Sequence, residues 1–189
     1  MPPKRSLSRS VRGSFFVEYV RMLRRRKDLH WERELPPGDV RYLHENILGD
    51  SWYPMETFER FGVAILSHVP GATLEAVRMW GRFSAGEYAK AHPDLIAPGQ
   101  PVESLMRLKV LRSTLFDFPA FEIPMLVDGH AIVAMNYQMG KVAEEAACYQ
   151  TMGFCESVLS LAGAKDIRAD FEERSWLGAP KTRLNLEWS

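Results

Sequence analysis

Two cysteines are the most reactive side chains in the sequence, and their spacing limits the chemistry open to them. Cys148 and Cys155 lie seven residues apart in a segment expected to be one helix. At a rise of ~1.5 Å per residue their Cα atoms lie ~10.5 Å apart, too far for a disulfide and awkward for one zinc ion. Free cysteine commonly packs as a small hydrophobic side chain. We therefore predict that both thiols are reduced and lie in the core, in a stripe with Met152, Leu159 and Ala162.

The five histidines form no catalytic or metal-binding pattern. None has the i, i+4 partner found on zinc protease helices. His44 and Glu45 are adjacent and splay apart around a helix, while His130 lies in an expected hairpin turn. The sequence has no phosphate-binding loop, dinucleotide fingerprint, nucleophile elbow or paired-cysteine zinc spacing. We therefore predict no catalytic residue and no metal ligand, and a chain that is not an enzyme.

Four aromatic residues are the candidates for lining a ligand pocket. Trp52 and Tyr53 stand just before Pro54, and Trp80 and Tyr88 follow in a later helical segment. Each combines a large apolar body with one polar group, which suits it to anchor a core or to line a cavity. Both interpretations stay open. Core anchoring needs a filled interior, whereas a pocket for an apolar small molecule needs a cavity of ~300 Å³ or more.

The composition is that of a folded globular protein. The chain has 189 residues, of which 46% are hydrophobic and 25% charged, and its net charge is zero. This length favours one domain that buries its core without disulfides or a structural metal. No apolar run reaches the ~18–20 residues that cross a bilayer, and no signal peptide opens the chain, so we expect a cytoplasmic protein.

The first segment of the chain is strongly basic. Residues 1–27 contain nine basic residues and one acidic residue, Glu18, so the rest of this neutral chain carries the matching acidic excess. We predict that residues 1–10 form a flexible basic tail. Such a tail could bind an acidic protein partner or phosphates. The favoured alternative is that Arg24 to Lys27 only end the first helix, facing water. Nucleic acid is not expected as a partner, because no aromatic residue interleaves with the arginines of the tail.

Helical periodicity dominates the first half of the sequence. Apolar residues at helical spacing predict a helix over 11–27, and a leucine stripe predicts another over 105–115. Asp39 can cap a helix that runs through Leu48, and Pro54 suits the first turn of the next helix. A further helix is expected from Thr73 to about Ala91.

The pattern changes to strands in the second half. Two β-rich runs, 121–127 and 131–137, flank Asp128-Gly129, which is a hairpin signal, and Pro124 indicates an edge strand or a bulge. A helix is expected over 141–162, and Gly163 supplies a left-handed stop. Alternation then predicts two more strands, over 167–172 and 184–188. The predicted fold class is α+β, with N-terminal helices packed on a four-stranded antiparallel sheet and a β-β-α-β-β C-terminal half.

Three stretches of the sequence resemble one known family. They are Gly13 with the amphipathic helix after it, Ser51-Trp52-Tyr53-Pro54, and the run LSLAGAKDIR at residues 159–168. From about residue 11 to Trp188 the chain resembles a myxobacterial paralogous family of unknown function, which is related to the 4-vinyl reductase domains and the haem-NO-binding-associated domains. The resemblance implies one vinyl-reductase-like domain over 11–189, similar to the small subunits of TRAPP vesicle-tethering complexes.

The same resemblance implies an apolar cavity between helices and sheet, a homodimer formed through helices, and a sensory or regulatory role. The sequence also departs from the relatives. Ser175 and Thr182 stand near positions where zinc-bearing relatives have cysteines, and neutral hydroxyls are poor zinc ligands. The haem-binding tyrosine-serine-arginine signature of the nitric-oxide sensors is also missing. We therefore predict a chain without metal or cofactor.

Two functions remain in competition. The favoured one is a non-enzymatic, small-molecule-sensing or regulatory module, with Trp52, Tyr53, Trp80 and Tyr88 lining its pocket. The alternative is a protein-interaction or scaffold module that dimerises without a ligand. A surplus of aromatic residues in the first half supports dimerisation, since apolar helix faces of that size usually mark an interaction surface. They are Phe15, Phe16, Tyr19, Trp52, Tyr53, Phe58 and Phe61.

Overall fold

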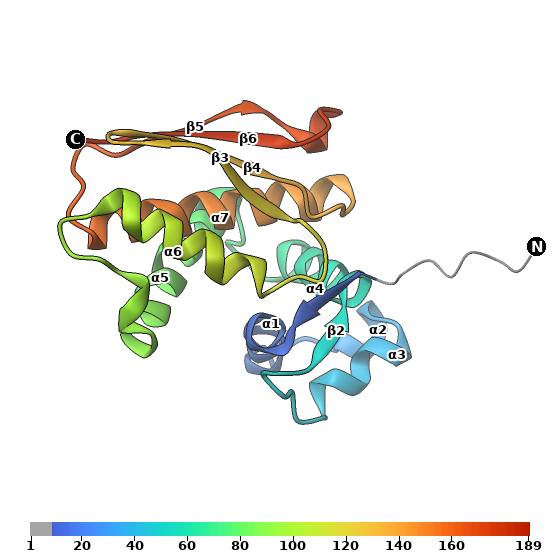
Figure 1. The fold of residues 1–189 in the computed structure, drawn as a ribbon. Helices are drawn as coiled ribbons and strands as arrows, with labels where there is room; N and C mark the ends of the chain where they lie inside the picture. The colour runs from blue at the N-terminus through green and yellow to red at the C-terminus, as the bar shows by residue number, and fades with distance from the viewer. Residues whose placement is uncertain (1–8) are drawn as a thin grey trace, which may run out of the picture. The chain divides into compact units, whose positions relative to one another are not determined.

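The computed structural model describes residues 9–189, which form two compact units. Unit 1 comprises residues 9–68 with 114–118, and unit 2 comprises residues 69–113 with 119–189. The predicted α+β class is confirmed (Figure 1). The domain predicted over 11–189 contains both units. Residues 1–8 of the predicted tail lie outside the described part of the chain, whereas Ser10 already begins a strand.

Unit 1 is helical, with one short pair of strands. Strands β1 and β2 are antiparallel and pair Ser10 with Pro54. The amphipathic pattern predicted over 11–27 forms α1, with Phe16, Tyr19 and Leu23 on its buried face. The elements of unit 1 are β1 (Ser10–Arg12), α1 (Gly13–Arg25), α2 (Trp31–Glu34), α3 (Pro37–Val40), η1 (Arg41–Leu43), β2 (Trp52–Pro54) and α4 (Met55–His68).

The first residue of α1 has to be glycine. A Cβ atom on Gly13 would lie 1.9 Å from the carbonyl oxygen of Leu48. This close approach lets the Gly13 amide donate to the carbonyl of Ser51 at 2.8 Å. The segment before β2 is thereby held against the start of α1.

Three local predictions in unit 1 are wrong. Asp39 does not cap a helix: its buried carboxylate accepts hydrogen bonds from Thr57 and Arg60 on α4. The helix also ends at Leu43 instead of Leu48, where Arg24 donates to the backbone carbonyls of Tyr42, Leu43 and Glu45 and takes the place of further helical hydrogen bonds. Pro54 ends strand β2, and α4 starts one residue later.

The core of unit 1 is built from aromatic rings. Phe16 stacks on Tyr53 with ring centroids 4.6 Å apart, and Tyr42 meets Phe16 edge to face. Phe58 and Phe61 are fully buried beside them. The aromatic surplus that supported a dimer therefore fills this core instead of forming an exposed face, and Trp52 alone among those seven residues is exposed.

Unit 2 contains the sheet and three long helices. Thr73 caps α5 as predicted, accepting a hydrogen bond from the amide of Ala76. Leu105, Leu108 and Leu111 of the leucine stripe lie on α6, which ends before Leu115, and the helix predicted over 141–162 is α7. The elements of unit 2 are α5 (Leu74–Ala91), η2 (Pro93–Leu95), α6 (Pro101–Ser113), β3 (Phe121–Val127), β4 (His130–Met135), α7 (Lys141–Leu161), β5 (Arg168–Glu173), η3 (Ser175–Leu177) and β6 (Thr182–Glu187).

The sheet has the strand order β3-β4-β6-β5, and every neighbouring pair is antiparallel, as predicted. Strands β3 and β4 form a hairpin around Gly129, whose φ is +76°. The pairing shifts register between Glu122 and Met125, around Pro124, because proline cannot donate to the ladder. β3 is an edge strand, so both parts of the prediction at Pro124 are confirmed.

Helix α7 is the centre of unit 2. It runs along one face of the sheet (Figure 1) and also contacts α5 and α6. The predicted stripe of Cys148, Met152, Cys155 and Leu159 is buried, and both cysteines are free. Their assignment to the core is confirmed. Among the described residues, no helix has an apolar stretch long enough to cross a bilayer.

Candidate functional site

Trp52 and Tyr53, two of the predicted pocket residues, lie in β2 of unit 1. The ring of Tyr53 stacks on Phe16, and its hydroxyl accepts a hydrogen bond from the Leu48 amide at 2.9 Å. Trp52 is 43% exposed and lies under the guanidinium of Arg12, 4.2 Å from its ring centroid. Adjacent strand residues point to opposite faces, so these two side chains diverge.

Trp80 and Tyr88, the other two, lie on α5 of unit 2 and are both half-buried. Tyr88 stacks on His92 at a centroid distance of 4.2 Å and meets Phe154 edge to face. Burial raises the pKa of Tyr88 above its ordinary value. Eight residues separate Trp80 from Tyr88, which is ~12 Å along a helix axis.

A polar site that no sequence motif indicates lies where α5 crosses α7. The two helix backbones touch at glycines: a Cβ on Gly81 would lie 2.0 Å from the carbonyl oxygen of Gln150. A Cβ on Gly153 would lie 1.9 Å from the carbonyl oxygen of Arg78. This contact brings side chains next to the glycines on one helix within reach of the other helix.

The crossing surrounds one buried carboxylate with two arginines. The Arg82 Nε atom donates to Glu156 Oε2 at 2.8 Å, and the Arg78 Nε atom donates to the same oxygen at 3.1 Å. Arg78 also donates to the other oxygen, Oε1. Burial by itself would raise the pKa of Glu156, but the hydrogen bonds from both arginines outweigh it and hold the pKa below its ordinary value. Glu156 is therefore ionised, and both of its carboxylate oxygens accept hydrogen bonds from the arginines.

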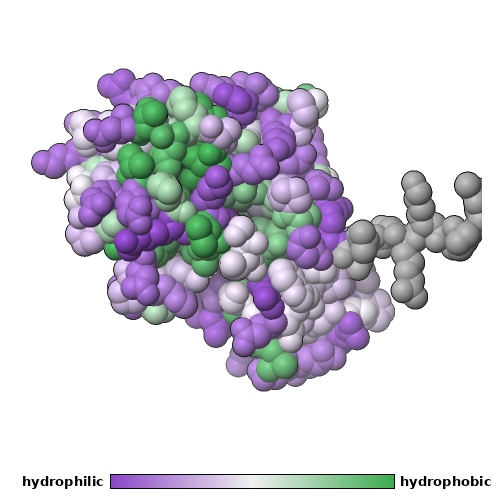
Figure 2. Space-filling model, in the orientation of Figure 1, coloured by the Kyte–Doolittle hydropathy of each residue, from purple (hydrophilic) through white to green (hydrophobic). Residues whose placement is uncertain are grey.

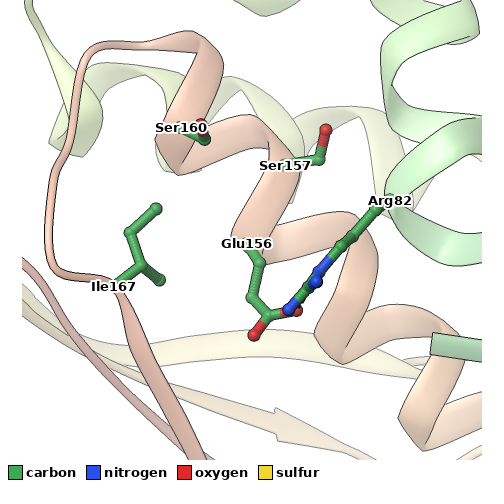
Figure 3. A pocket seen from close by; sticks show the side chains of 5 residues that line it. All are labelled: Arg82, Glu156, Ser157, Ser160 and Ile167. Carbon is green, nitrogen blue, oxygen red and sulfur yellow. Dashed lines mark hydrogen bonds and ion pairs between the residues drawn. The ribbon is translucent and has the colours of Figure 1, made fainter. Parts of the chain in front are cut away.

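A pocket of about 290 Å³ opens beside this ion pair. It is lined by Arg82 from α5, by Glu156, Ser157 and Ser160 from α7, and by Ile167 just before β5. Figure 3 shows Arg82 reaching from α5 toward the Glu156 carboxylate, with Ile167 on the other side of the carboxylate. One arginine, two serines and one apolar side chain thus line a single small volume.

A second polar centre is buried in unit 2. Arg112 on α6 donates through Nη2 to the Tyr137 hydroxyl at 3.0 Å and to Thr151, and the Tyr137 and Thr151 oxygens lie 2.6 Å apart. Burial raises the pKa of Tyr137 to about 12 and that of the Cys155 thiol to about 12. Burial also raises the pKa of Cys148. The phenol and both thiols are therefore neutral at pH 7 and are poor nucleophiles.

Ser175 and Thr182, which the resemblance placed near a zinc-binding turn, lie side by side. Their hydroxyl oxygens are 2.8 Å apart, and the Ser175 hydroxyl donates to the buried Glu144 at 3.1 Å. The Cys148 thiol donates to Thr182 at 3.6 Å. These bonds tie η3 to α7, so the hydroxyls fasten a turn. Within residues 9–189, no group of three or more His, Cys, Asp or Glu side chains could hold a metal ion.

Comparison with known proteins assigns the fold to a class. No protein-family model matches the chain, and no curated protein matches its sequence. Solved structures of H-NOX proteins do match it, so the chain has an H-NOX-like fold. An Fe(II) H-NOX protein from S. oneidensis is 14% identical with a TM-score of 0.64, covering 94% of this chain and 96% of that one.

Two further H-NOX structures agree. A mutant of the Fe(II) unliganded H-NOX protein from K. algicida is 10% identical with a TM-score of 0.65, covering 94% of this chain and 96% of that one. A mutant of T. Tengcongensis H-NOX is 14% identical with a TM-score of 0.61, covering 94% and 97%. The predicted relation to haem-NO-binding-associated folds is confirmed at this coarse level. The myxobacterial and vinyl-reductase assignments stay predictions.

Within residues 9–189, the imidazoles and thiols do not fit the axial ligand of a haem held inside either unit. Haem iron takes an axial His, Cys thiolate, Met or Tyr ligand. His30 and His44 are exposed, and the other three imidazoles contact Glu34, Tyr88 and Asn185. Both thiols are buried and protonated. We therefore derive no function of this chain through haem.

The residues of the α5–α7 site could not be predicted from the sequence, because they are brought together only by the fold. Arg78 and Glu156 are 78 positions apart, and no local pattern pairs them. One signal was available: Gly81 and Gly153 interrupt two helical patterns, and an isolated glycine in a helix often marks a close backbone approach. The sequence alone does not distinguish these two glycines from Gly86, which also interrupts a helix but has nothing within 4 Å of its Cβ position.

Proposed function

We propose that this chain is a non-enzymatic regulatory module that binds a small molecule. The likeness of its fold to H-NOX proteins over nearly the whole chain carries this proposal. Those solved structures include H-NOX proteins in the Fe(II)NO and Fe(II)CO ligation states. In those proteins the scaffold holds small molecules. Here we propose that the ligand binds without iron, since no imidazole or thiol of the described residues suits the iron inside either unit.

The pocket between α5 and α7 supports this proposal from the chain's own residues. Its volume of about 290 Å³ lies just below the ~300 Å³ at which the usual range for small-molecule sites begins, so the ligand must be small. The side chains around it bind and orient, and none is poised as a nucleophile or a general base. Glu156 is held ionised by two arginines, so it cannot serve as an acid near neutral pH. Binding without chemistry is the function that this arrangement suits.

The pocket predicted from Trp52, Tyr53, Trp80 and Tyr88 remains part of the proposal as an apolar alternative. A titration of tryptophan fluorescence with apolar aromatic compounds tests it, because ligand contact quenches or shifts indole emission. Trp52→Phe and Trp80→Phe identify which indole responds. A saturable change that disappears in either variant supports this apolar pocket.

A thermal-shift screen with several hundred small metabolites tests the proposed function. A ligand that binds only the folded chain raises its Tm by mass action, and the shift grows with ligand concentration. We expect at least one compound to give a concentration-dependent rise. A screen without any rise, on a chain that unfolds cooperatively, would remove the small-molecule proposal.

A second candidate function is a protein-interaction module that pairs with a second copy of the chain. Apolar side chains gather on the surface over α6 and β3 of unit 2 (Figure 2). Met106 and Val110 on α6 are 52% and 66% exposed, and Val127 on β3 is 52% exposed. Met106 and Val110 are four residues apart and share one helix face. We call Met106 and Val110 the α6 surface.

A further inference from the structure

We propose that the pocket between α5 and α7 binds the carboxylate of a small organic acid, with Arg82 as its anchor. This inference rests on the proposed function and names the ligand class for one site. Three observations support the inference. Arg82 and two serines in the pocket have unused hydrogen-bond donors, the Glu156 carboxylate repels ligands with more than one negative charge, and Ile167 adds an apolar side chain.

Arg82 is oriented for this role by Glu156. Only its Nε atom is used, at 2.8 Å from Glu156 Oε2, and the side chain is 47% exposed. Within the described chain, no hydrogen bond or ion pair involves its two terminal nitrogens. A guanidinium presents its donors in a planar fork, so fixing one edge on Glu156 leaves another edge for a second oxyanion. A carboxylate accepts two parallel hydrogen bonds from that edge.

The two serines add hydroxyl groups to the lining of the pocket. Ser157 and Ser160 are three residues apart and line the pocket from one helix face. Neither hydroxyl makes a hydrogen bond to any described residue, so both can donate to a ligand oxygen. Glu156, in contrast, already accepts three N–H bonds and has little capacity left for a ligand donor. The pocket therefore favours an acceptor over an amine or a guanidinium.

The charge of Glu156 and the apolar side chain of Ile167 determine which anions the pocket favours. The carboxylate of Glu156 lies in the lining, so each negative charge on a ligand is repelled by it. A monoanion meets less repulsion than the dianion of inorganic phosphate. Ile167 supplies an apolar side chain, which suits a ligand with a hydrocarbon or aromatic body. A small aromatic monocarboxylate combines both properties.

The contact of α5 and α7 makes the site rigid. Arg82 follows Gly81, and Glu156 lies three residues after Gly153, so both side chains start from the point where the two backbones touch. A preorganised site loses less conformational entropy when a ligand binds. The carboxylate pocket is thus a product of the helix crossing.

Isothermal titration calorimetry of the full chain with benzoate, benzyl alcohol and inorganic phosphate tests this inference. We expect saturable benzoate binding, no binding of the uncharged alcohol, and phosphate binding at least about tenfold weaker. The variant Arg82→Gln should raise the Kd for benzoate by about tenfold or more, because losing a hydrogen bond to a charged group usually changes affinity by that factor. Ser157→Ala with Ser160→Ala should weaken it less. Lys90→Gln is the matched control, since it removes an exposed cation from the same helix and should leave binding unchanged.

The outcomes separate this inference from the proposed function. Circular dichroism must show that each variant is folded, and Arg82→Lys, which keeps the charge but loses the fork, should bind with intermediate affinity. Equal binding of phosphate or benzyl alcohol, or unchanged binding by Arg82→Gln, would overturn the carboxylate site. So would no benzoate binding at all. If the thermal-shift screen still finds another ligand, the proposed function stands while this site does not.

Discussion

Gly81 and Gly153 meet where α5 crosses α7, so closely that neither position has room for a Cβ atom. A methyl group on Gly81 would lie 2.0 Å from the carbonyl oxygen of Gln150, and one on Gly153 would lie 1.9 Å from that of Arg78. The obstacle in both cases is backbone, which cannot rotate away as a side chain can. This contact holds Arg78 and Arg82 against Glu156, and it determines the shape of the candidate site.

We predict that Gly153→Ala destabilises the chain by about 1–3 kcal/mol, because the methyl group forces the two helices apart. The matched control is Gly86→Ala on α5, where a Cβ atom would have nothing within 4 Å. That substitution should stabilise the chain by about 0.5–1 kcal/mol, since alanine is the better helix former. Urea unfolding measures both. Equal effects of the two substitutions would contradict the close crossing.

The buried stripe on α7 gives a second prediction. Leu159 is fully buried, and Leu159→Ala should cost ~2–5 kcal/mol of unfolding free energy by leaving a cavity. Cys148→Ala removes fewer atoms and should cost less. Both thiols are buried and protonated, so thiol reagents should label them only as fast as the chain opens. Rapid labelling of both cysteines in the native protein would show that the stripe is not in the core.

Glu156 gives a prediction about pH. Its pKa in the folded chain lies below its ordinary value of 4.5 because of the bonds from Arg78 and Arg82, which outweigh burial. The stability contributed by these bonds is therefore complete well above that ordinary pKa and is lost as pH falls through the lower, folded pKa. Glu156→Gln should destabilise the chain at pH 6, and the gap to the parent should narrow as the pH falls. Urea unfolding at several pH values measures this gap, and a constant gap would contradict the ion pair.

The α6 surface gives a prediction for the alternative function. If a second copy covers Met106 and Val110, the chain is dimeric at tens of micromolar, and Met106→Asp with Val110→Asp makes it monomeric. Analytical ultracentrifugation distinguishes the two masses. The control is Val63→Asp, on α4 of unit 1, where an apolar side chain is 36% exposed outside this surface. A parent chain that sediments as a monomer at tens of micromolar would contradict the proposed dimer.

Local sequence signals located most of the elements. Thr73 as an N-cap, Asp128-Gly129 as a hairpin and Gly163 as a left-handed stop each depend on a few adjacent residues. Hydrophobic alternation located β6, whose leucines face the core. These predictions succeeded because neighbouring residues alone determine the backbone there.

The failures depend on contacts between distant residues. Aspartate is a common helix cap, but the Asp39 carboxylate instead accepts hydrogen bonds from Arg60 and Thr57. The aromatic residues of the first half are more numerous than one helix face needs, which suggested an exposed surface. Most of them instead pack together in the core of unit 1, and the sequence alone does not reveal how large that core is. The site around Glu156 joins residues more than 70 positions apart, and only the structure brings them together.

Native mass spectrometry of the purified chain tests the central claim, binding of a small molecule, most directly. We predict an additional mass of a few hundred daltons or less, released by collisional activation, on the chain as purified or after incubation with the compounds found by thermal shift. A small organic acid would agree with the carboxylate pocket as well. A chain that carries no added mass under either condition, and that forms only protein dimers, would contradict the small-molecule function and favour the interaction module.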